Sequence, residues 1–194
     1  MKVQKIIQHR INTVAGLEQV DSQFGVECDI RAYQDKLVLH HEAFVEGDSF
    51  EEYLKKLAGR SIILNTKCEG LEEEILKLLV ENAVEDYFFL DLSLPFLVKY
   101  AKKGMKNIAI RYSEFEPLEF VKRFEGLVDW VWIDCFTKFP LDEASYAYLS
   151  AHFKTCLVSP ELQGHSLHQF QEFTSSIRNF SFDAVCTKQP HLWK

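Results

Sequence analysis

The stretch SIILNTKCEGLEEEILKLLVENAVEDYFFLD, residues 61–91, decides the fold. Its two ends, SIILN (61–65) and YFFLD (87–91), are apolar on both faces of an extended chain, which is typical of strands covered on both sides. Between them, apolar residues recur at helical spacing, at Leu71, Ile75, Leu78 and Leu79. A strand, a helix and a second strand in this order predict a parallel pair of strands joined by a crossover helix.

The same alternation extends over the whole chain. Short apolar runs predict strands at VQKII (3–7), GVECDI (25–30), LVLH (37–40), SIILN (61–65), YFFLD (87–91), NIAIR (107–111), WVWID (130–134), TCLVS (155–159) and DAVCT (183–187). Longer runs with helical period lie between them, at about 14–23, 49–58, 70–82, 94–103, 116–125, 141–152 and 166–178. Asp48 and Ser49 are the N-cap candidates of the second helix. The pattern predicts an α/β protein with a parallel sheet.

The number of strands favours a closed barrel. Taking 25–30 and 37–40 as one bent strand leaves about eight strand regions, as in a (β/α)8 barrel. A doubly wound sheet usually carries a glycine-rich turn after its first strand, and QHRINT (8–13) contains no glycine. Since no linker or low-complexity segment interrupts the chain, we expect residues 1–194 to form a single small closed TIM barrel with minimal loops.

The composition excludes several classes of protein. The 22 Lys and Arg residues against 29 Asp and Glu give a net charge of −7, which argues against nucleic-acid binding. No apolar run approaches the roughly 18–20 residues that a membrane span needs, and the N-terminus lacks the features of a signal peptide. Five cysteines without a CxxC pair indicate neither a disulfide scaffold nor a zinc ribbon. We therefore expect a reduced cytoplasmic domain.

Two carboxylates within one apolar run form the least ordinary feature of the sequence. Glu27 and Asp29 are two positions apart on a predicted strand, so both side chains point to the same face. Burying both without compensation costs several kcal/mol. Two compensations are consistent with the sequence: a divalent metal, which prefers hard oxygen ligands, or a buried ion-pair cluster with Arg10, Arg31 or Lys67.

Two histidines stand near this pair. His9 and His41 lie at ends of predicted strands, the carboxyl-terminal edge at which parallel barrels bind substrate. Two histidines that titrate near neutrality can act as general base and general acid on a phosphate ester. His40 and His41 point in opposite directions if their strand continues, so that only one of them faces the barrel.

With these residues the sequence resembles the glycerophosphodiester phosphodiesterase family, within the wider phosphatidylinositol-phospholipase-C-like phosphodiesterase barrels. The resemblance covers about the first third of the chain. Four family motifs have counterparts here: IIQHRI for the strand that ends in His-Arg-Gly, GVECDIR for Gly-Val-Glu-x-Asp-Val, LVLHHE for an apolar run that ends in His-Asp, and ILNTK for Glu-x-Lys. The resemblance implies a closed β/α barrel with phosphodiesterase activity.

The resemblance also implies roles for single residues. His9 and His41 would be the acid–base pair, and Arg10 and Lys67 would contact phosphate oxygens. Glu27 and Asp29 would bind Mg²⁺ or Ca²⁺, with Asn65 in place of the third, glutamate ligand of the family. An amide oxygen can ligate these ions but brings no charge, so the metal should bind weakly. The acidic residues that could supply the missing charge are Glu42, Asp91 and Glu161.

Charged residues at later strand ends suggest a substrate rim. Arg111, Glu114 and Asp134 follow two neighbouring predicted strands. They could bind a sugar or polyol head group through paired hydrogen bonds, or they could form only a salt bridge at the rim.

Two functions follow from these observations. The first is a metal-assisted phosphodiesterase that hydrolyses a small glycerol- or polyol-phosphodiester by His/His acid–base catalysis. The second is a catalytically impaired barrel that binds a phosphorylated ligand or a protein partner. Asn65 favours the second, as does the absence of two segments of the family, its Pro-Glu-Asn-Thr segment and its substrate-capping insertion.

Overall fold

The computed structural model describes residues 2–194, at Leu167 for the backbone alone. Two compact units make up this chain. The N-terminal unit consists of residues 7–98, and the C-terminal unit consists of residues 2–6 and 99–194. Strand β1 (Lys2–Gln8) and helix α4 (Leu94–Lys102) each contribute residues to both units.

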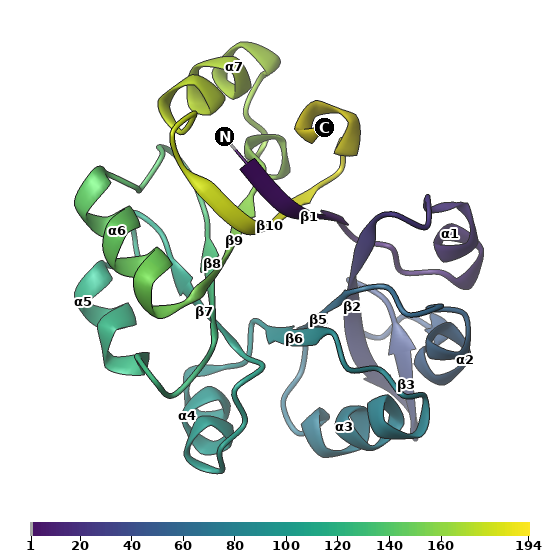
Figure 1. The fold of residues 1–194 in the computed structure, drawn as a ribbon. Coiled ribbons are helices and arrows are strands. Elements are labelled where there is room, and N and C mark those ends of the chain that lie inside the picture. Colours follow the sequence, from purple (N-terminus) through teal and green to yellow (C-terminus); the bar gives the residue numbers. More distant parts are fainter. Residues whose placement is uncertain (1) are drawn as a thin grey trace. The chain divides into compact units, whose positions relative to one another are not determined.

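The N-terminal unit contains the strand–helix–strand stretch that the sequence predicts. Its elements are α1 (Val14–Gln19), β2 (Gly25–Tyr33), β3 (Lys36–Leu39), β4 (Asp48–Ser49), α2 (Phe50–Lys55), β5 (Ile62–Thr66), α3 (Glu72–Glu81) and β6 (Tyr87–Leu90). Strand β2 pairs in parallel with the end of β1 and with β5, and β5 pairs in parallel with β6. Helices α1, α2 and α3 lie on the same side of these parallel strands (Figure 1). Because Asp29 is the register partner of Asn65, polar residues of β2 and β5 come to the same level.

The interpretation of 25–30 and 37–40 as one bent strand is wrong. Strands β2 and β3 form an antiparallel hairpin, in which Ile30 pairs with Leu39 and Tyr33 with Lys36. The turn contains Gln34 in the left-handed region at a φ of 55°, which reverses the chain direction within two residues. Strand β3 ends at Leu39, so His40 and His41 lie in the following loop rather than alternating along a strand.

The C-terminal unit repeats the alternation of strands and helices. Its elements after α4 are β7 (Ala109–Tyr112), α5 (Leu118–Val121), η1 (Lys122–Phe124), β8 (Trp130–Ile133), α6 (Glu143–His152), β9 (Lys154–Val158), η2 (Pro160–Gln163), α7 (Leu167–Ser176), β10 (Ser181–Thr187) and η3 (Pro190–Trp193). Strands β7, β8, β9 and β10 are parallel neighbours in this order. Helices α5, α6 and α7 lie along one face of these strands (Figure 1). The predicted α/β class is confirmed in both units.

Strands β5 and β8 are buried on both faces, as their apolar runs predict, whereas Ile7 alone is buried among the residues of β1. In β2, Val26, Cys28 and Ile30 are fully buried on one face, and Glu27 and Asp29 are buried on the other. The predicted helices are also found, within a few residues of the expected bounds. Ser49 is the N-cap of α2, and its hydroxyl accepts the N–H of Glu52 at 3.4 Å. Asp48 instead helps to cap α1: its carboxylate accepts the N–H of Val14 at 2.7 Å, in addition to the N-cap Thr13, whose hydroxyl accepts the N–H of Gly16.

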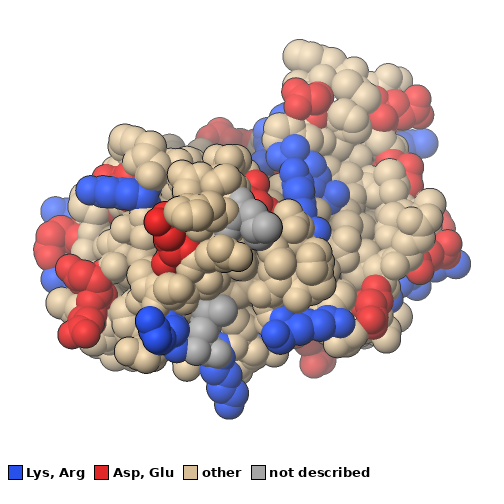
Figure 2. All heavy atoms as spheres, turned by 90° about the horizontal axis from the view of Figure 1, so that it is seen from above, with Lys and Arg blue, Asp and Glu red and all other residues tan. Residues whose placement is uncertain are grey.

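The distribution of surface charge relates to the expectation about nucleic-acid binding, and the helix lengths relate to the expectation about membrane spans. On the face shown in Figure 2, the Lys and Arg side chains of the described residues are scattered among acidic and uncharged ones. None of the described helices combines the length and the apolar content that a bilayer crossing requires.

Candidate functional site

The predicted site residues of the N-terminal unit gather around two buried carboxylates of β2. We call Glu27, Asp29 and the side chains that contact them the carboxylate centre. Glu27 is fully buried and Asp29 is 1% exposed. Both side chains lie on the same face of the strand because successive residues of a strand alternate between its faces. The prediction that they would be buried together is confirmed.

Hydrogen bonds hold Glu27 without neutralising its charge. The side-chain amide of Asn65 donates to Oε1 at 2.9 Å, and the backbone N–H of Arg10 donates to Oε2 at 2.7 Å. Burial and the nearby Asp29 raise the pKa of Glu27 from 4.5 to about 7, against the opposing effect of these hydrogen bonds and of Lys67. Glu27 can therefore exchange a proton near neutral pH.

Asp29 is neutralised by cations and fixed by an amide. Its Oδ1 lies 3.2 Å from Nζ of Lys67, and its Oδ2 lies 3.5 Å from Nε of Arg10. Asn12 forms a reciprocal pair with it, donating to Oδ2 at 2.7 Å and accepting the N–H of Asp29 at 2.8 Å. Of the two compensations left open by the sequence, the ion-pair cluster is present, and its cations are Arg10 and Lys67. Arg31, the third candidate, instead donates to backbone carbonyls.

Lys67 and the backbone around it form one edge of the centre. Its Nζ lies 3.7 Å from Oδ2 of Asp91, at the end of β6. Arg10 and Asp91 both have a positive φ, of 57° and 58°, which is uncommon for residues other than glycine. The same conformation occurs at Gln34, Phe44, Ala58 and Ala83, away from the centre, so it does not by itself mark a functional position.

Asn65 offers an oxygen that could complete a metal site. Its Oδ1 is buried and has no hydrogen-bond partner among the described residues, while its Nδ2 is engaged with Glu27. An orphaned amide oxygen beside two carboxylates fits a hard divalent cation. Among the described residues no cluster of three or more His, Cys, Asp or Glu side chains has a metal-binding arrangement. The donor set fits a weak site, with two charged ligands and one neutral one.

The two predicted catalytic histidines have different surroundings. Nε2 of His9 lies 3.6 Å from Oε2 of Glu27, and the side chain is 15% exposed. His41 lies in the loop after β3, 40% exposed, with Nδ1 2.6 Å from Oε1 of Glu42. The hydrogen bond and the charge of His41 lower the pKa of Glu42. His9 thus joins the carboxylate centre directly, and His41 has its own acidic partner.

The predicted rim residues of the C-terminal unit form two groups whose charged side chains already have hydrogen-bond or ion-pair partners. Arg111 pairs with Asp134 and lies 3.6 Å from Glu116, and Asp134 also accepts hydrogen bonds from Gln163 and from the N–H of Cys135. Glu114 accepts the N–H groups of residues 136–138. Its partial burial opposes ionisation, but these hydrogen bonds outweigh it and lower the pKa of Glu114. The salt bridge is therefore present, and the role of these residues in binding a head group stays a prediction.

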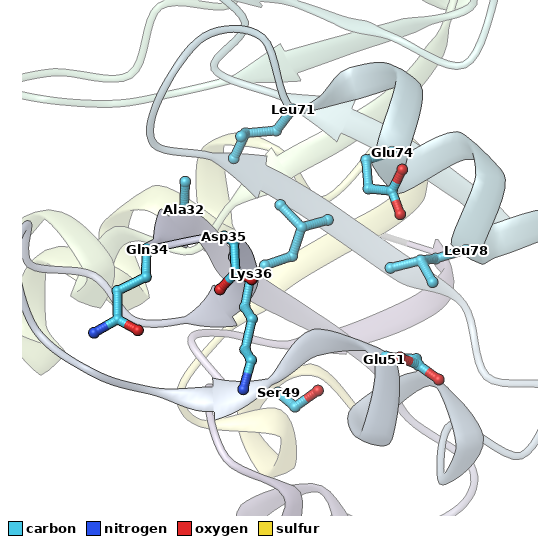
Figure 3. Close-up of a pocket in the computed structure, with 10 residues that line it drawn as sticks. Ala32, Gln34, Asp35, Lys36, Ser49, Glu51, Leu71, Glu74 and Leu78 are labelled. Carbon is cyan, nitrogen blue, oxygen red and sulfur yellow. The ribbon is translucent and has the colours of Figure 1, made fainter.

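Among the described residues of the N-terminal unit, a small cavity lies beside the carboxylate centre and a larger one lies away from it. A cavity of about 170 Å³ is lined by residues that include Lys67, Asp91 and Ser93. A larger one, of about 560 Å³, lies between the β2–β3 hairpin and helices α2 and α3. Figure 3 shows Lys36 beside Ser49 at one wall of it, and Glu74 and Leu78 of α3 at another. None of the predicted site residues lines this larger cavity in the described chain.

Sequence reasoning assigned no role to Asn12. It is nevertheless the residue that holds both the carboxylate and the backbone N–H of Asp29. A signal was present, since Asn12 follows His9 and Arg10 at a strand end, where substrate-binding loops of parallel barrels begin.

Comparisons with known proteins show a likeness in structure. No protein-family model matches the chain, and no curated protein matches its sequence. A crystal structure of a glycerophosphodiester phosphodiesterase from Agrobacterium tumefaciens str. C58 covers 100% of this chain, which covers 99% of that one, at 14% identity and a TM-score of 0.67. A glycerophosphoryl diester phosphodiesterase from Parabacteroides distasonis ATCC 8503 covers 97% of this chain, which covers 84% of that one, at 13% identity and a TM-score of 0.65. The fold that the resemblance implies is therefore shared with these two structures, at low sequence identity.

Proposed function

We propose that this protein is a metal-assisted phosphodiesterase that hydrolyses a small glycerol- or polyol-phosphodiester. The observation that carries the proposal is the carboxylate centre, where side chains of both charges and one histidine come together beside β2: Glu27, Asp29, Arg10, Lys67 and His9. Acidic ligands for a cation and basic ligands for a phosphate in one cluster are what a phosphodiester needs. The fold shared with two phosphodiesterases supports the same activity, and we propose that the strands close into the single barrel expected from the sequence.

Glu27, Asp29 and Asn65 are the residues that would hold Mg²⁺ or Ca²⁺. The buried, unpartnered Oδ1 of Asn65 supports this assignment. When bound, the ion would neutralise the phosphate and lower the pKa of an attacking hydroxyl or water. Arg10 and Lys67, which both lie beside Asp29, would each direct N–H donors to phosphate oxygens.

His9 and His41 would share the proton transfers. His9 is suited to accept the proton of the nucleophile at Nε2, since Glu27 lies 3.6 Å from this atom and stabilises the positive charge that results. His41 would donate a proton to the leaving alkoxide from Nε2, because Glu42 contacts the other ring nitrogen, Nδ1, and leaves Nε2 for the substrate. The two pairs give each histidine its own carboxylate.

A second function is favoured by one observation. Asp29 already has two cationic partners, and the centre lacks a third carboxylate among the described residues. A protein with this arrangement could bind a phosphorylated ligand through Arg10 and Lys67 without hydrolysing it. Binding without turnover would identify this function.

The experiment that tests the proposal is a phosphodiesterase assay between about pH 5 and 9 with divalent metal, using glycerophosphodiesters as substrates. We expect a bell-shaped profile, because one histidine must be neutral while the other is protonated. His9→Ala and His41→Ala should each lower the rate by roughly 10²–10⁴-fold. His168→Ala is the control, since it removes an exposed histidine of α7 that belongs to neither proposed pair and should retain most of the activity.

A calorimetric titration with glycerol phosphate separates the two functions. Turnover that requires metal and both histidines supports the phosphodiesterase. Binding that weakens in Arg10→Ala and Lys67→Ala, without turnover by the wild type, supports the binding protein. If the protein shows no turnover and no binding, both functions are refuted.

A further inference from the structure

Arg31 connects two loops of the candidate site through their backbone. Its Nε and Nη2 donate to the carbonyl oxygen of His41 at 2.9 and 2.7 Å, and its Nη1 donates to the carbonyl oxygen of Lys67 at 3.1 Å. These carbonyls belong to the loops that follow β3 and β5. One side chain thus holds the backbone of the proposed acid and of a proposed phosphate ligand.

The position of Arg31 on β2 explains this reach. It lies two residues beyond Asp29 and therefore on the same face of the strand. Strand β3 pairs with β2 on one side, with Val38 opposite Arg31, and β5 pairs with it on the other. Arg31 thus stands between the ends of two neighbouring strands, at the level where each chain leaves the sheet.

Apart from Arg31, the His41 loop is tied to the carboxylate centre through the backbone N–H of His40, which donates to the carbonyl of Asp29. The ring of His41 contacts Glu42, and its carbonyl contacts Arg31. Lys67, in contrast, contacts Asp29 of the centre directly. The guanidinium group of Arg31 therefore joins the backbone of the proposed acid directly to the backbone of the proposed phosphate ligand.

We infer that Arg31 is a positioning residue, which ties the His41 loop and the Lys67 loop to β2 and fixes the proposed acid relative to the phosphate. This role rests on the proposed function. An arginine is required because its planar fork presents several donors in a fixed geometry, whereas a lysine ammonium is a flexible point charge. A lysine at this position keeps the positive charge but cannot donate hydrogen bonds to both carbonyl oxygens in the same geometry.

The test compares Arg31→Lys with Arg60→Lys. Arg60 is a matched control, since its guanidinium also donates to two carbonyls of separate segments, those of Val20 and Leu57. Three backbone amides report the two loops: His40, bonded to the carbonyl of Asp29; Glu42, bonded to Nδ1 of His40; and Lys67, bonded to the carbonyl of Ile30. In Arg31→Lys we expect hydrogen exchange to become about tenfold faster at these amides in both loops, the size of effect that losing one or two hydrogen bonds produces. In Arg60→Lys these amides should exchange as in the wild type.

The values of kcat and KM distinguish a positioning residue from a residue that only stabilises the fold. We expect Arg31→Lys to lower kcat by about 10²-fold, the cost of displacing a catalytic group by about 1 Å. KM should change much less, because Asp29 still holds the ammonium group of Lys67. Arg60→Lys should leave kcat unchanged. Should Arg31→Lys fail to fold, Arg31→Gln, which retains a single amide donor group, serves in the same measurements.

The outcomes keep this inference separate from the proposed function. Unchanged exchange in both loops of the Arg31 variant would overturn it, as would faster exchange with a wild-type kcat. If the wild-type protein shows no turnover, the proposed function fails while the exchange data still decide whether Arg31 joins the loops. In that case the role of Arg31 in positioning a catalytic acid is refuted together with the activity.

Discussion

Glu27 is a residue whose surroundings set a measurable dependence of stability on pH. Its pKa is raised from 4.5 to about 7 by burial and by Asp29, so the folded protein binds a proton that the unfolded chain releases. The free energy of unfolding therefore falls as the pH rises from about 4.5 to about 7 and then levels off. The shift corresponds to roughly 3 kcal/mol. Urea unfolding in EDTA at a series of pH values should show this loss.

Glu27→Gln should remove that dependence. A glutamine carries no charge at any pH, and Asn65 can rotate its amide to present Oδ1, which has no partner in the described chain, to the new donor. The exposed Glu46 supplies the control, since Glu46→Gln removes the same charge from the surface. If the wild type and Glu27→Gln lose stability equally between about pH 5 and 8, the carboxyl does not titrate as inferred.

Asn65 makes the metal proposal testable at the same scale. Asn65→Asp adds a third carboxylate next to Glu27, which should tighten binding of Ca²⁺ or Mg²⁺ more than tenfold from a Kd on the order of 10⁻⁴–10⁻³ M. Without metal the same variant should be less stable than the wild type, because three like charges repel. Calorimetric titration measures the first effect and urea unfolding in EDTA the second. If Asn65→Asp binds the metal more tightly but is as stable as the wild type in EDTA, the ion binds at another site.

At the scale of elements, a residue of β4 stabilises a helix that is distant in the sequence. The carboxylate of Asp48 accepts the N–H of Val14, the first residue of α1, at 2.7 Å. Removing a helix cap costs about 1 kcal/mol, so Asp48→Ala should lower the free energy of unfolding by about that amount. Asp48→Asn, which keeps an acceptor oxygen, should lose less. Urea unfolding at neutral pH measures both.

Ser49→Ala is the comparison for this cap. Ser49 caps α2 locally, but its hydroxyl lies 3.4 Å from the N–H of Glu52, a longer and weaker bond. We expect Ser49→Ala to cost less than Asp48→Ala. The reverse order would show that the cap predicted next to α2 matters more than the long-range one.

At the scale of the molecule, the proposed closed barrel predicts one cooperative unfolding transition. All three tryptophans, Trp130, Trp132 and Trp193, belong to the C-terminal unit, so their fluorescence reports that unit alone. Asp48 belongs to the N-terminal unit. If the chain unfolds as one body, Asp48→Ala should lower the urea midpoint seen by fluorescence as much as that seen by circular dichroism. An unchanged fluorescence midpoint would show two independently folding units.

The sequence by itself determined the elements and the face on which the carboxylates lie. Periodicity is a local property: a two-residue repeat places Glu27 and Asp29 on one face, and a helical repeat sets a helix close to the observed Glu72–Glu81. Burial of both acids followed from the apolar residues that flank them. The α/β class and the acid pair could be predicted because each depends on neighbours along the chain.

Only the tertiary structure decided which partners these groups have. Asn12 and Lys67 reach Asp29 from loops that come before and after β2 in the sequence. Asp48 helps to cap α1 rather than the helix beside it, and Arg31 donates to carbonyls instead of neutralising the acids. The physical reason is that a side chain's partner depends on where separate loops come together. Loop paths follow from turns such as the one at Gln34, which made a hairpin of an expected single strand, and residue spacing alone does not encode them.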